Sequence, residues 1–254
     1  MLLNSDNTIK KGFAYLSQDP VMSFFIKSFG DQIDPLDRYN NNFGIAICNL
    51  IIEQQISFKA AISIKEKFNR IVKDLTNKEV LELDDKVIQS VGLSFRKVSY
   101  MKNILKFFEQ EKIDILTIED TELSKKLCSI KGIGPWTAEM FLLFICHKTD
   151  VFSFGDIALL NSVKINYSVK NLDEIKAISS KWKPFRSIAS LLLWKSVENK
   201  IFYKFLINNE KPIIIRITKM VFLNIALDNL TLILVPKYCP NKAGAVMIRL
   251  TNKS

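Results

Sequence analysis

The chain has 254 residues, of which 48% are hydrophobic and 24% are charged, and its formal net charge is +10 at pH 7. This length and composition allow a sizeable core in one large domain or two small ones, and they exclude an intrinsically disordered chain. The positive charge favours a polyanionic partner. However, the chain is also rich in Lys, Asn and Ile, as an AT-rich genome would encode, so charge alone does not establish nucleic-acid binding.

Cysteine and histidine usage narrows the possible chemistry. None of the four cysteines forms a C-x-x-C pair, so the sequence predicts neither a zinc site nor an iron–sulfur cluster. His147 is the only histidine, which removes histidine-based triads and most catalytic metal sites. We therefore expect no cofactor and no metal.

The predicted elements are almost all helical. Residues 1–40 predict a short helical lead-in with turns at Asp19-Pro20 and Asp34-Pro35. From Gly44 to about Trp194, apolar residues recur at helical spacing. Within this stretch the sequence predicts helix starts at Ser57 and Ser94, a helix end at Gly92, and Pro184 in the first turn of a last helix.

The C-terminal tail has a different composition. Residues 211–235 contain two apolar runs rich in Ile, Leu and Val, which favour strands. Charged and polar residues interrupt these runs, so we expect no membrane span. The tail could form a small β-rich extension, pack on the helical body or lack order.

The segment 127–138 predicts a helix, a glycine hairpin and a second helix. Gly132 and Gly134 flank Ile133, and glycine lets successive amide groups face one phosphate oxygen. The N-terminus of the helix that begins near Trp136 adds partial positive charge, and Lys131 would strengthen the contact. An ordinary tight turn between helices is the alternative, and Gly-x-Gly alone would favour that alternative.

The wider pattern resembles a known family. Leu-x-x-Ile-x-Gly-Ile-Gly-x-Trp-Thr-Ala at 127–138 resembles the helix–hairpin–helix DNA glycosylases, most closely the DNA-3-methyladenine glycosylase II branch. Three more segments agree, at 52–57 (Ile-Glu-Gln-Gln-Ile-Ser), 91–97 (Val-Gly-Leu-Ser-Phe-Arg-Lys) and 182–189 (Trp-Lys-Pro-Phe-Arg-Ser-Ile-Ala). The resemblance covers roughly residues 10–205.

The resemblance implies an all-α, two-lobed helix–hairpin–helix glycosylase fold with a DNA cleft between the lobes. We expect a helical body over 1–206, with one lobe at 44–155 and the other formed by 1–43 together with 156–206. Residues 207–254 would be a C-terminal extension of unknown role, with a possible small β-rich structure.

The resemblance also implies a catalytic residue. In this superfamily an aspartate after the second helix of the hairpin promotes loss of the base, and the matching residue is Asp156. A carboxylate there would stabilise the positive charge that develops on the sugar. The alternative is that Asp156 only caps the helix that follows it, and the two roles are compatible. Asp150 is a nearby rival that we interpret as a loop residue.

Bifunctional relatives, which also cut the strand, carry a nucleophilic lysine two residues after the second glycine of the hairpin. Here that position is Trp136. The resemblance therefore implies a monofunctional enzyme that uses water and leaves an abasic site. The missing four-cysteine cluster argues against the endonuclease III and adenine-glycosylase branches.

Other site residues follow from matching positions. Trp136 and Trp194 match aromatic residues of the base pocket, where an indole face would stack on a cationic methylated purine, and Met140 replaces a tyrosine of some relatives. Gln55, within the Gln54-Gln55 turn, is the candidate wedge for the gap left by a flipped base. The expected phosphate contacts are Lys131, Gly132, Ile133, Gly134 and Thr137. Core packing of each Trp and a capped surface turn at Gln54-Gln55 are the alternatives.

The expected function is base excision repair of alkylated purines, 3-methyladenine and 7-methylguanine, in double-stranded DNA. We expect a monomer without membrane association, located in the cytoplasm of a bacterial-type cell and bound to the nucleoid through DNA. Two alternatives stay open: a glycosylase for another damaged base, and a non-catalytic helix–hairpin–helix DNA-binding module.

Overall fold

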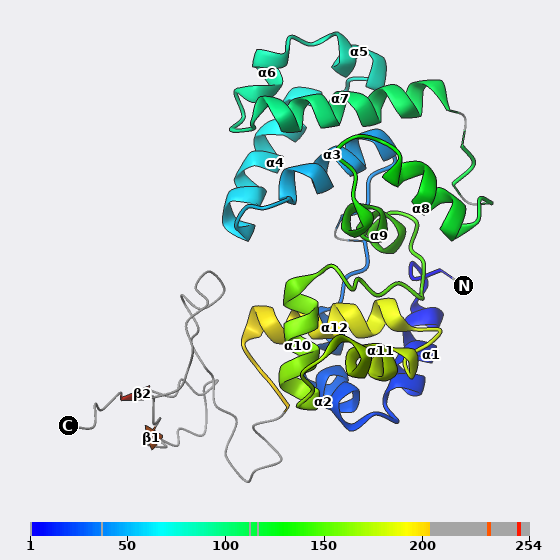
Figure 1. The fold of residues 1–254 in the computed structure, drawn as a ribbon, viewed down its shortest axis with the longest axis vertical. Coiled ribbons are helices and arrows are strands. Elements are labelled where there is room, and N and C mark those ends of the chain that lie inside the picture. The colour runs from blue at the N-terminus through cyan, green and yellow to red at the C-terminus, as the bar shows by residue number, and fades with distance from the viewer. Residues whose placement is uncertain are drawn as a thin grey trace.

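The computed structural model describes residues 2–36, 38–111, 113–115 and 117–203, together with the backbone of 233–234 and 248–249. The helices form two lobes, one above the other in Figure 1. The first lobe contains α3 Phe43–Glu53, α4 Phe58–Val72, α5 Asn77–Glu82, α6 Asp85–Gln89, α7 Phe95–Gln110, α8 Asp120–Cys128 and α9 Pro135–Phe144. The second contains α1 Asp6–Leu16, α2 Pro20–Phe29, the short 3₁₀ helix η1 Gly30–Gln32, α10 Ile157–Tyr167, α11 Leu172–Ser180 and α12 Arg186–Asn199.

Helix α3 is the centre of the first lobe. It is apolar on almost every side, as expected for a helix surrounded by others, and it packs against α4, α7 and α9. Helix α7 turns Val98, Met101 and Leu105 into the core. The caps predicted from sequence are confirmed, because the Ser57 and Ser94 hydroxyls accept the amides of Ala60 and Lys97.

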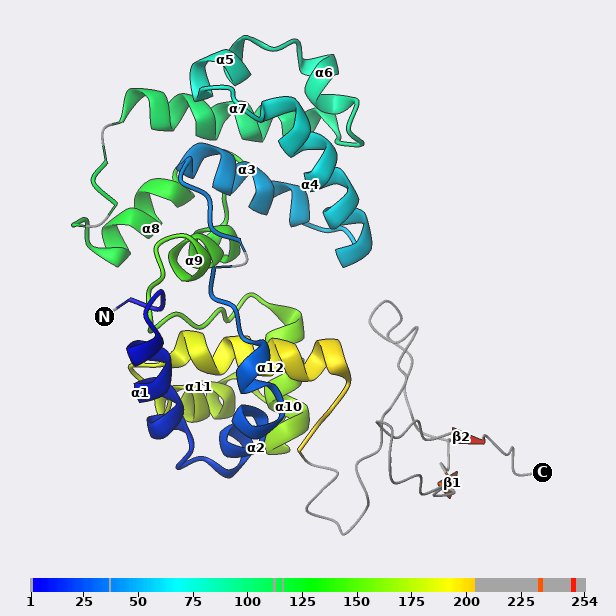
Figure 2. The ribbon, with the colours of Figure 1, turned by 180° about the vertical axis from the view of Figure 1, so that it is seen from behind.

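Helix α12 is the centre of the second lobe, where it packs against α1, α2 and α10. Figure 2 shows the N-terminal helices α1 and α2 beside α12 from the other side, so the second lobe joins segments from both ends of the described chain. The chain crosses between the lobes before α3 and again between α9 and α10.

A network of hydrogen bonds centred on Asp19 connects these distant segments. Asp19 caps α2 through one carboxylate oxygen, and its other oxygen accepts hydrogen bonds from Tyr167 Oη at 2.8 Å and Trp182 Nε1 at 3.3 Å. Trp182 is almost fully buried, so its ring packs within the core. Burial and the nearby Asp19 charge both raise the pKa of Tyr167, so this hydroxyl stays protonated and donates.

Two expectations need correction or fall outside the described residues. Pro184 does not lie in the first turn of the last helix, because α12 begins at Arg186 with Phe185 at its N-cap. Within 211–235, where the sequence predicts strands, the structure describes only β1 Ile233–Leu234, which pairs antiparallel with β2 Ile248–Arg249. The rest of 211–235 lies outside the described residues. Among the helices that are described, none combines the length and the apolar character needed to cross a bilayer.

We predict that Asp19→Ala lowers the free energy of unfolding by about 2–3 kcal/mol, since it removes a helix cap and two side-chain hydrogen bonds. Asp19→Asn keeps a capping oxygen and should lose about half as much. Urea denaturation measures both changes, with the exposed Asp31→Ala as the control variant. Equal stability of Asp19→Ala and the control would contradict the stabilising role of the Asp19 hydrogen bonds.

Candidate active site

The glycine hairpin between α8 and α9 has a shape that only glycine allows. Gly132 has φ +104°, and a Cβ atom there would lie 2.1 Å from Tyr100 Cγ, so the ring of Tyr100 fills the space. Ile133 is buried and anchors the hairpin to the core, whereas Lys131 is exposed. A Cβ atom on Gly134 would meet nothing within 4 Å. The second glycine therefore faces open space.

The hairpin turns its carbonyl groups toward the protein. Gly132 O accepts from Gln54 Nε2 at 3.2 Å, Lys131 O from Asn103 Nδ2 at 3.4 Å, and Ile130 O from the Ile133 amide at 3.0 Å. In the described part of the chain, the amides of Gly132, Gly134 and Trp136 donate to no partner. Free amides at a helix N-terminus, next to an exposed lysine, are suited to an anion such as phosphate.

The turn after α3 is fixed against this hairpin. Gln54 Nε2 also donates to Thr137 Oγ1 at 2.9 Å, and Lys97 Nζ donates to the carbonyls of Ile52 and Gln54 at 2.9 and 2.7 Å. Gln55 follows with φ +56° and an exposed side chain. Of the two glutamines, the structure thus binds Gln54 to the hairpin and leaves Gln55 projecting from the turn. Thr137 is buried, so its hydroxyl faces Gln54 rather than solvent.

Asp156 connects the two lobes. Its Oδ1 accepts the Leu159 amide at 2.8 Å, so it is the N-cap of α10, as the alternative interpretation predicted. Its Oδ2 accepts Trp136 Nε1 at 3.0 Å, which brings two of the predicted site residues together. Each carboxylate oxygen is held by a different element, so the orientation of the group is fixed. Asp156 is half-buried, and Ile157 beside it is exposed.

A second carboxylate, which the sequence analysis missed, lies close to Asp156. Glu139 stands three residues after Trp136, on the same face of α9, and its Oε2 accepts the Ser153 hydroxyl. Burial raises the pKa of Glu139, and the charge of Asp156 raises it further, against the lowering effect of Ser153. The helical spacing from Trp136 was the signal that could have identified Glu139.

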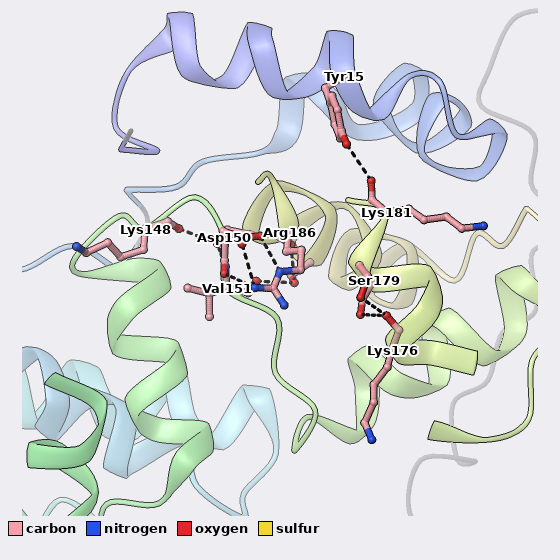
Figure 3. A network of polar contacts seen from close by, with 11 residues as sticks. Tyr15, Lys148, Asp150, Val151, Lys176, Ser179, Lys181 and Arg186 are labelled. Atoms are coloured by element: carbon pink, nitrogen blue, oxygen red, sulfur yellow. Dashed lines mark hydrogen bonds and ion pairs between the residues drawn. The ribbon is translucent and has the colours of Figure 1, made fainter. Parts of the chain in front are cut away.

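The loop before Asp156 is also pinned from α12. Figure 3 shows Arg186 paired with Asp150, with Nε 2.6 Å from Oδ1 and Nη2 3.0 Å from Oδ2. Ser187 accepts the Val151 amide at 2.9 Å and donates to Lys148 O at 2.6 Å. Asp150 is thus a loop residue in an ion pair, as predicted. The small polar residues at the start of α12 bind the backbone of the crossing segment.

The other predicted pocket residues lie on two helices, Met140 on α9 and Trp194 on α12. Trp194 is half-buried and stacks on Phe144, with ring centroids 5.8 Å apart and planes at 22°. The Arg38 guanidinium lies 4.2 Å from the centroid of Phe144 and pairs with Glu53 at 3.0 Å. Met140 is 1% exposed, so the structure places it in the core rather than on an open surface. No local sequence pattern could have predicted the contact between Arg38 and Phe144.

This geometry agrees with the match between this chain and a protein family. Residues 48–186, more than half of the chain, match the HhH-GPD family, described as HhH-GPD superfamily base excision DNA repair protein. The chain belongs to the HhH-GPD superfamily. The predicted resemblance and the two-lobed all-α fold are confirmed.

Within the HhH-GPD superfamily, the chain is similar to several named proteins. A Bacillus subtilis protein provisionally named a DNA-3-methyladenine glycosylase is 28% identical over 162 residues, which cover 58% of this chain and 56% of that protein. The chain therefore spans little more than half the length of this relative. The solved structure of a Schizosaccharomyces pombe 3-methyladenine DNA glycosylase, in complex with abasic DNA, has a TM-score of 0.68 and 25% identity, covering 74% of this chain and 97% of that one.

Enzymes with the same fold also act on other substrates. An 8-oxoguanine glycosylase/lyase from Clostridium acetobutylicum, in complex with double-stranded DNA, matches with a TM-score of 0.61 and 20% identity, covering 76% of this chain and 71% of that one. At this identity the likeness shows the fold alone. Within the HhH-GPD superfamily, substrate must therefore be inferred from the residues of the site.

The two hairpin glycines of this HhH-GPD protein should respond differently to alanine. Gly132→Ala should lower the free energy of unfolding by about 1–3 kcal/mol, because the methyl group overlaps Tyr100 and the backbone is left-handed. Gly134→Ala should stay within about 1 kcal/mol of the wild type. Urea denaturation of the two variants tests this, and similar losses in both would contradict the geometry of the hairpin.

Proposed function

We propose that this protein is a monofunctional DNA glycosylase that removes alkylated purines, 3-methyladenine and 7-methylguanine, from double-stranded DNA. The proposed reaction breaks the N-glycosidic bond, the bonding electrons leave with the base, and water adds to the sugar carbon. The product is an abasic site. The names of the relatives support the substrate class, and the site supports the reaction.

The observation that carries this proposal is the orientation of Asp156. Its carboxylate is held by Trp136 on one side and by the α10 amide on the other, and it follows the helix that begins at the hairpin. A preorganised negative charge stabilises the oxocarbenium character that develops as the base departs. A DNA-binding module without chemistry has no need of this arrangement.

The absence of a lysine nucleophile supports a monofunctional mechanism. Trp136 occupies the position of the lysine that forms a Schiff base in bifunctional relatives, and its indole donates to Asp156. Lys131 is exposed and directly precedes Gly132 in the hairpin. Water is therefore the proposed nucleophile, with Asp156 orienting it.

Base flipping brings the target to this carboxylate. In the proposed complex the hairpin amides hold one phosphate, and exposed Gln55 enters the gap left by the flipped base. The base would enter beside Trp136 of α9, and Trp194 would contribute from α12. The Arg38 guanidinium contacts Phe144, the ring on which Trp194 stacks, and Glu53 offsets part of its positive charge. Met140 supports the pocket from within the core.

The first test is to incubate the purified protein with methylated duplex DNA and to measure released bases, with and without later alkali. We expect free 3-methyladenine or 7-methylguanine, and strand breaks only after alkali. Breaks without alkali would contradict the monofunctional mechanism. Tight DNA binding without release of any alkylated base would support another damaged base, tested with oxidised and deaminated substrates, or the binding module.

We expect Asp156→Asn to reduce single-turnover base release by about 100-fold or more, the scale seen when one preorganised electrostatic group is removed. Asparagine is as good an N-cap as aspartate, but its amide nitrogen cannot accept from Trp136 Nε1, so we expect a stability loss of only about 1 kcal/mol. Base release under single-turnover conditions and thermal unfolding are measured in parallel. Near wild-type release would exclude Asp156 as the catalytic carboxylate.

Lys131→Ala tests the phosphate contact separately. The affinity for undamaged duplex should fall at low salt. The slope of log K against log salt concentration should become less steep, by about the amount that one phosphate contact contributes. Single-turnover release at saturating enzyme should change little. A matched control is Lys170→Ala, an exposed lysine of the second lobe before α11. Equal salt slopes for wild type and Lys131→Ala would contradict this role.

A further inference from the structure

The loop that carries Asp156 is tied to α9 at two points. Trp136 Nε1 donates to the Asp156 side chain at 3.0 Å, and one helical turn later Glu139 accepts the hydroxyl of Ser153. The Asp156 amide lies 3.4 Å from Ser153 O, so the two ties meet at the same turn of the loop. Side chains three residues apart on a helix share a face, which explains how one helix supplies both.

The second tie is the better shielded of the two. Ser153 is 1% exposed and Glu139 is half-buried, whereas Gly155 between the ties is exposed. A Cβ atom on Gly155 would be 3.9 Å from both Ser153 Oγ and Trp136 Cβ, which shows how closely the loop lies on α9. Gly155 has no side chain of its own to hold the loop in place.

We propose that Glu139, acting through Ser153, is a positioning residue that holds the Asp156 loop on α9 for base release. This inference rests on the proposed glycosylase function. Glu139 acts as a hydrogen-bond acceptor here, and the carboxylate that faces the sugar is Asp156. Burial raises the pKa of Glu139, which reflects the cost of desolvating this carboxylate.

Position matters because catalytic groups depend on geometry. A displacement of about 1 Å at a catalytic group can cost on the order of 100-fold in rate. Without the Ser153 tie, the loop would keep its Trp136 hydrogen bond and the α10 cap, so the protein should fold but Asp156 should sample more orientations. The expected loss is therefore one of rate, with DNA affinity preserved.

The experiment compares Glu139→Ala, Ser153→Ala, the double variant and Glu139→Gln, with Glu109→Ala, an exposed glutamate of α7, as the control. Single-turnover release should fall about ten-fold in each Ala variant, with affinity for abasic DNA unchanged. The double variant should be no slower than the slower single variant, since both remove one contact. Glu139→Gln keeps an acceptor oxygen and should stay within about three-fold of wild type.

Hydrogen exchange of the 150–160 segment gives a second measurement that needs no substrate. We expect faster exchange of the Asp156 and Leu159 amides in Glu139→Ala and Ser153→Ala, and wild-type exchange in Glu139→Gln. Unchanged exchange in the Ala variants, additive losses in the double variant, or a Gln variant as slow as the Ala variant would each overturn the proposal. A wild type that releases no base contradicts the proposed function instead, and the exchange result still decides whether Glu139 holds the loop.

Discussion

The hydrogen bond between Trp136 and Asp156 is the contact on which the site depends. It joins the first turn of α9, in one lobe, to the N-cap of α10, in the other, at 3.0 Å. Because the other oxygen of the same carboxylate caps α10, the group cannot rotate without losing one of two bonds. A single aspartate thereby caps one helix and accepts a hydrogen bond from another, so its orientation is fixed.

Helix α9 organises everything around that contact. In the hairpin at its N-terminus, Gly132 O accepts from Gln54, and the first two turns of the helix supply Trp136 and Glu139 to the loop. At its other end, Phe144 stacks on Trp194 and lies under Arg38. Most of the helix between them is buried, so these groups are held by a rigid element, which suits a preorganised site.

The second lobe contributes Asp156 and Trp194, and its other polar contacts support the loop that carries Asp156. The start of α12 binds the crossing segment through Arg186 and Ser187. The hydrogen bonds of Asp19 connect α2 to Tyr167 at the end of α10 and to Trp182 after α11. A scaffold of this kind can keep its shape while pocket residues vary, which is consistent with one fold in both alkylpurine and 8-oxoguanine glycosylases. We therefore expect a few residues on α9, α10 and α12 to decide which substrate this chain accepts.

The sequence alone determined the helical class, the hairpin, the caps at Ser57 and Ser94 and the family, because helical periodicity, glycine and capping chemistry act over only a few residues. It also pointed to Asp156 and left open whether that residue caps a helix. Tertiary structure alone decided that Asp156 caps α10 and accepts from Trp136 at once, that Gln54 binds the hairpin while Gln55 projects, and that Met140 is buried. It also brought Glu139 to Ser153 and Arg38 to Phe144. These contacts join residues distant along the chain, and their partners are set by how the helices pack, which no local pattern encodes.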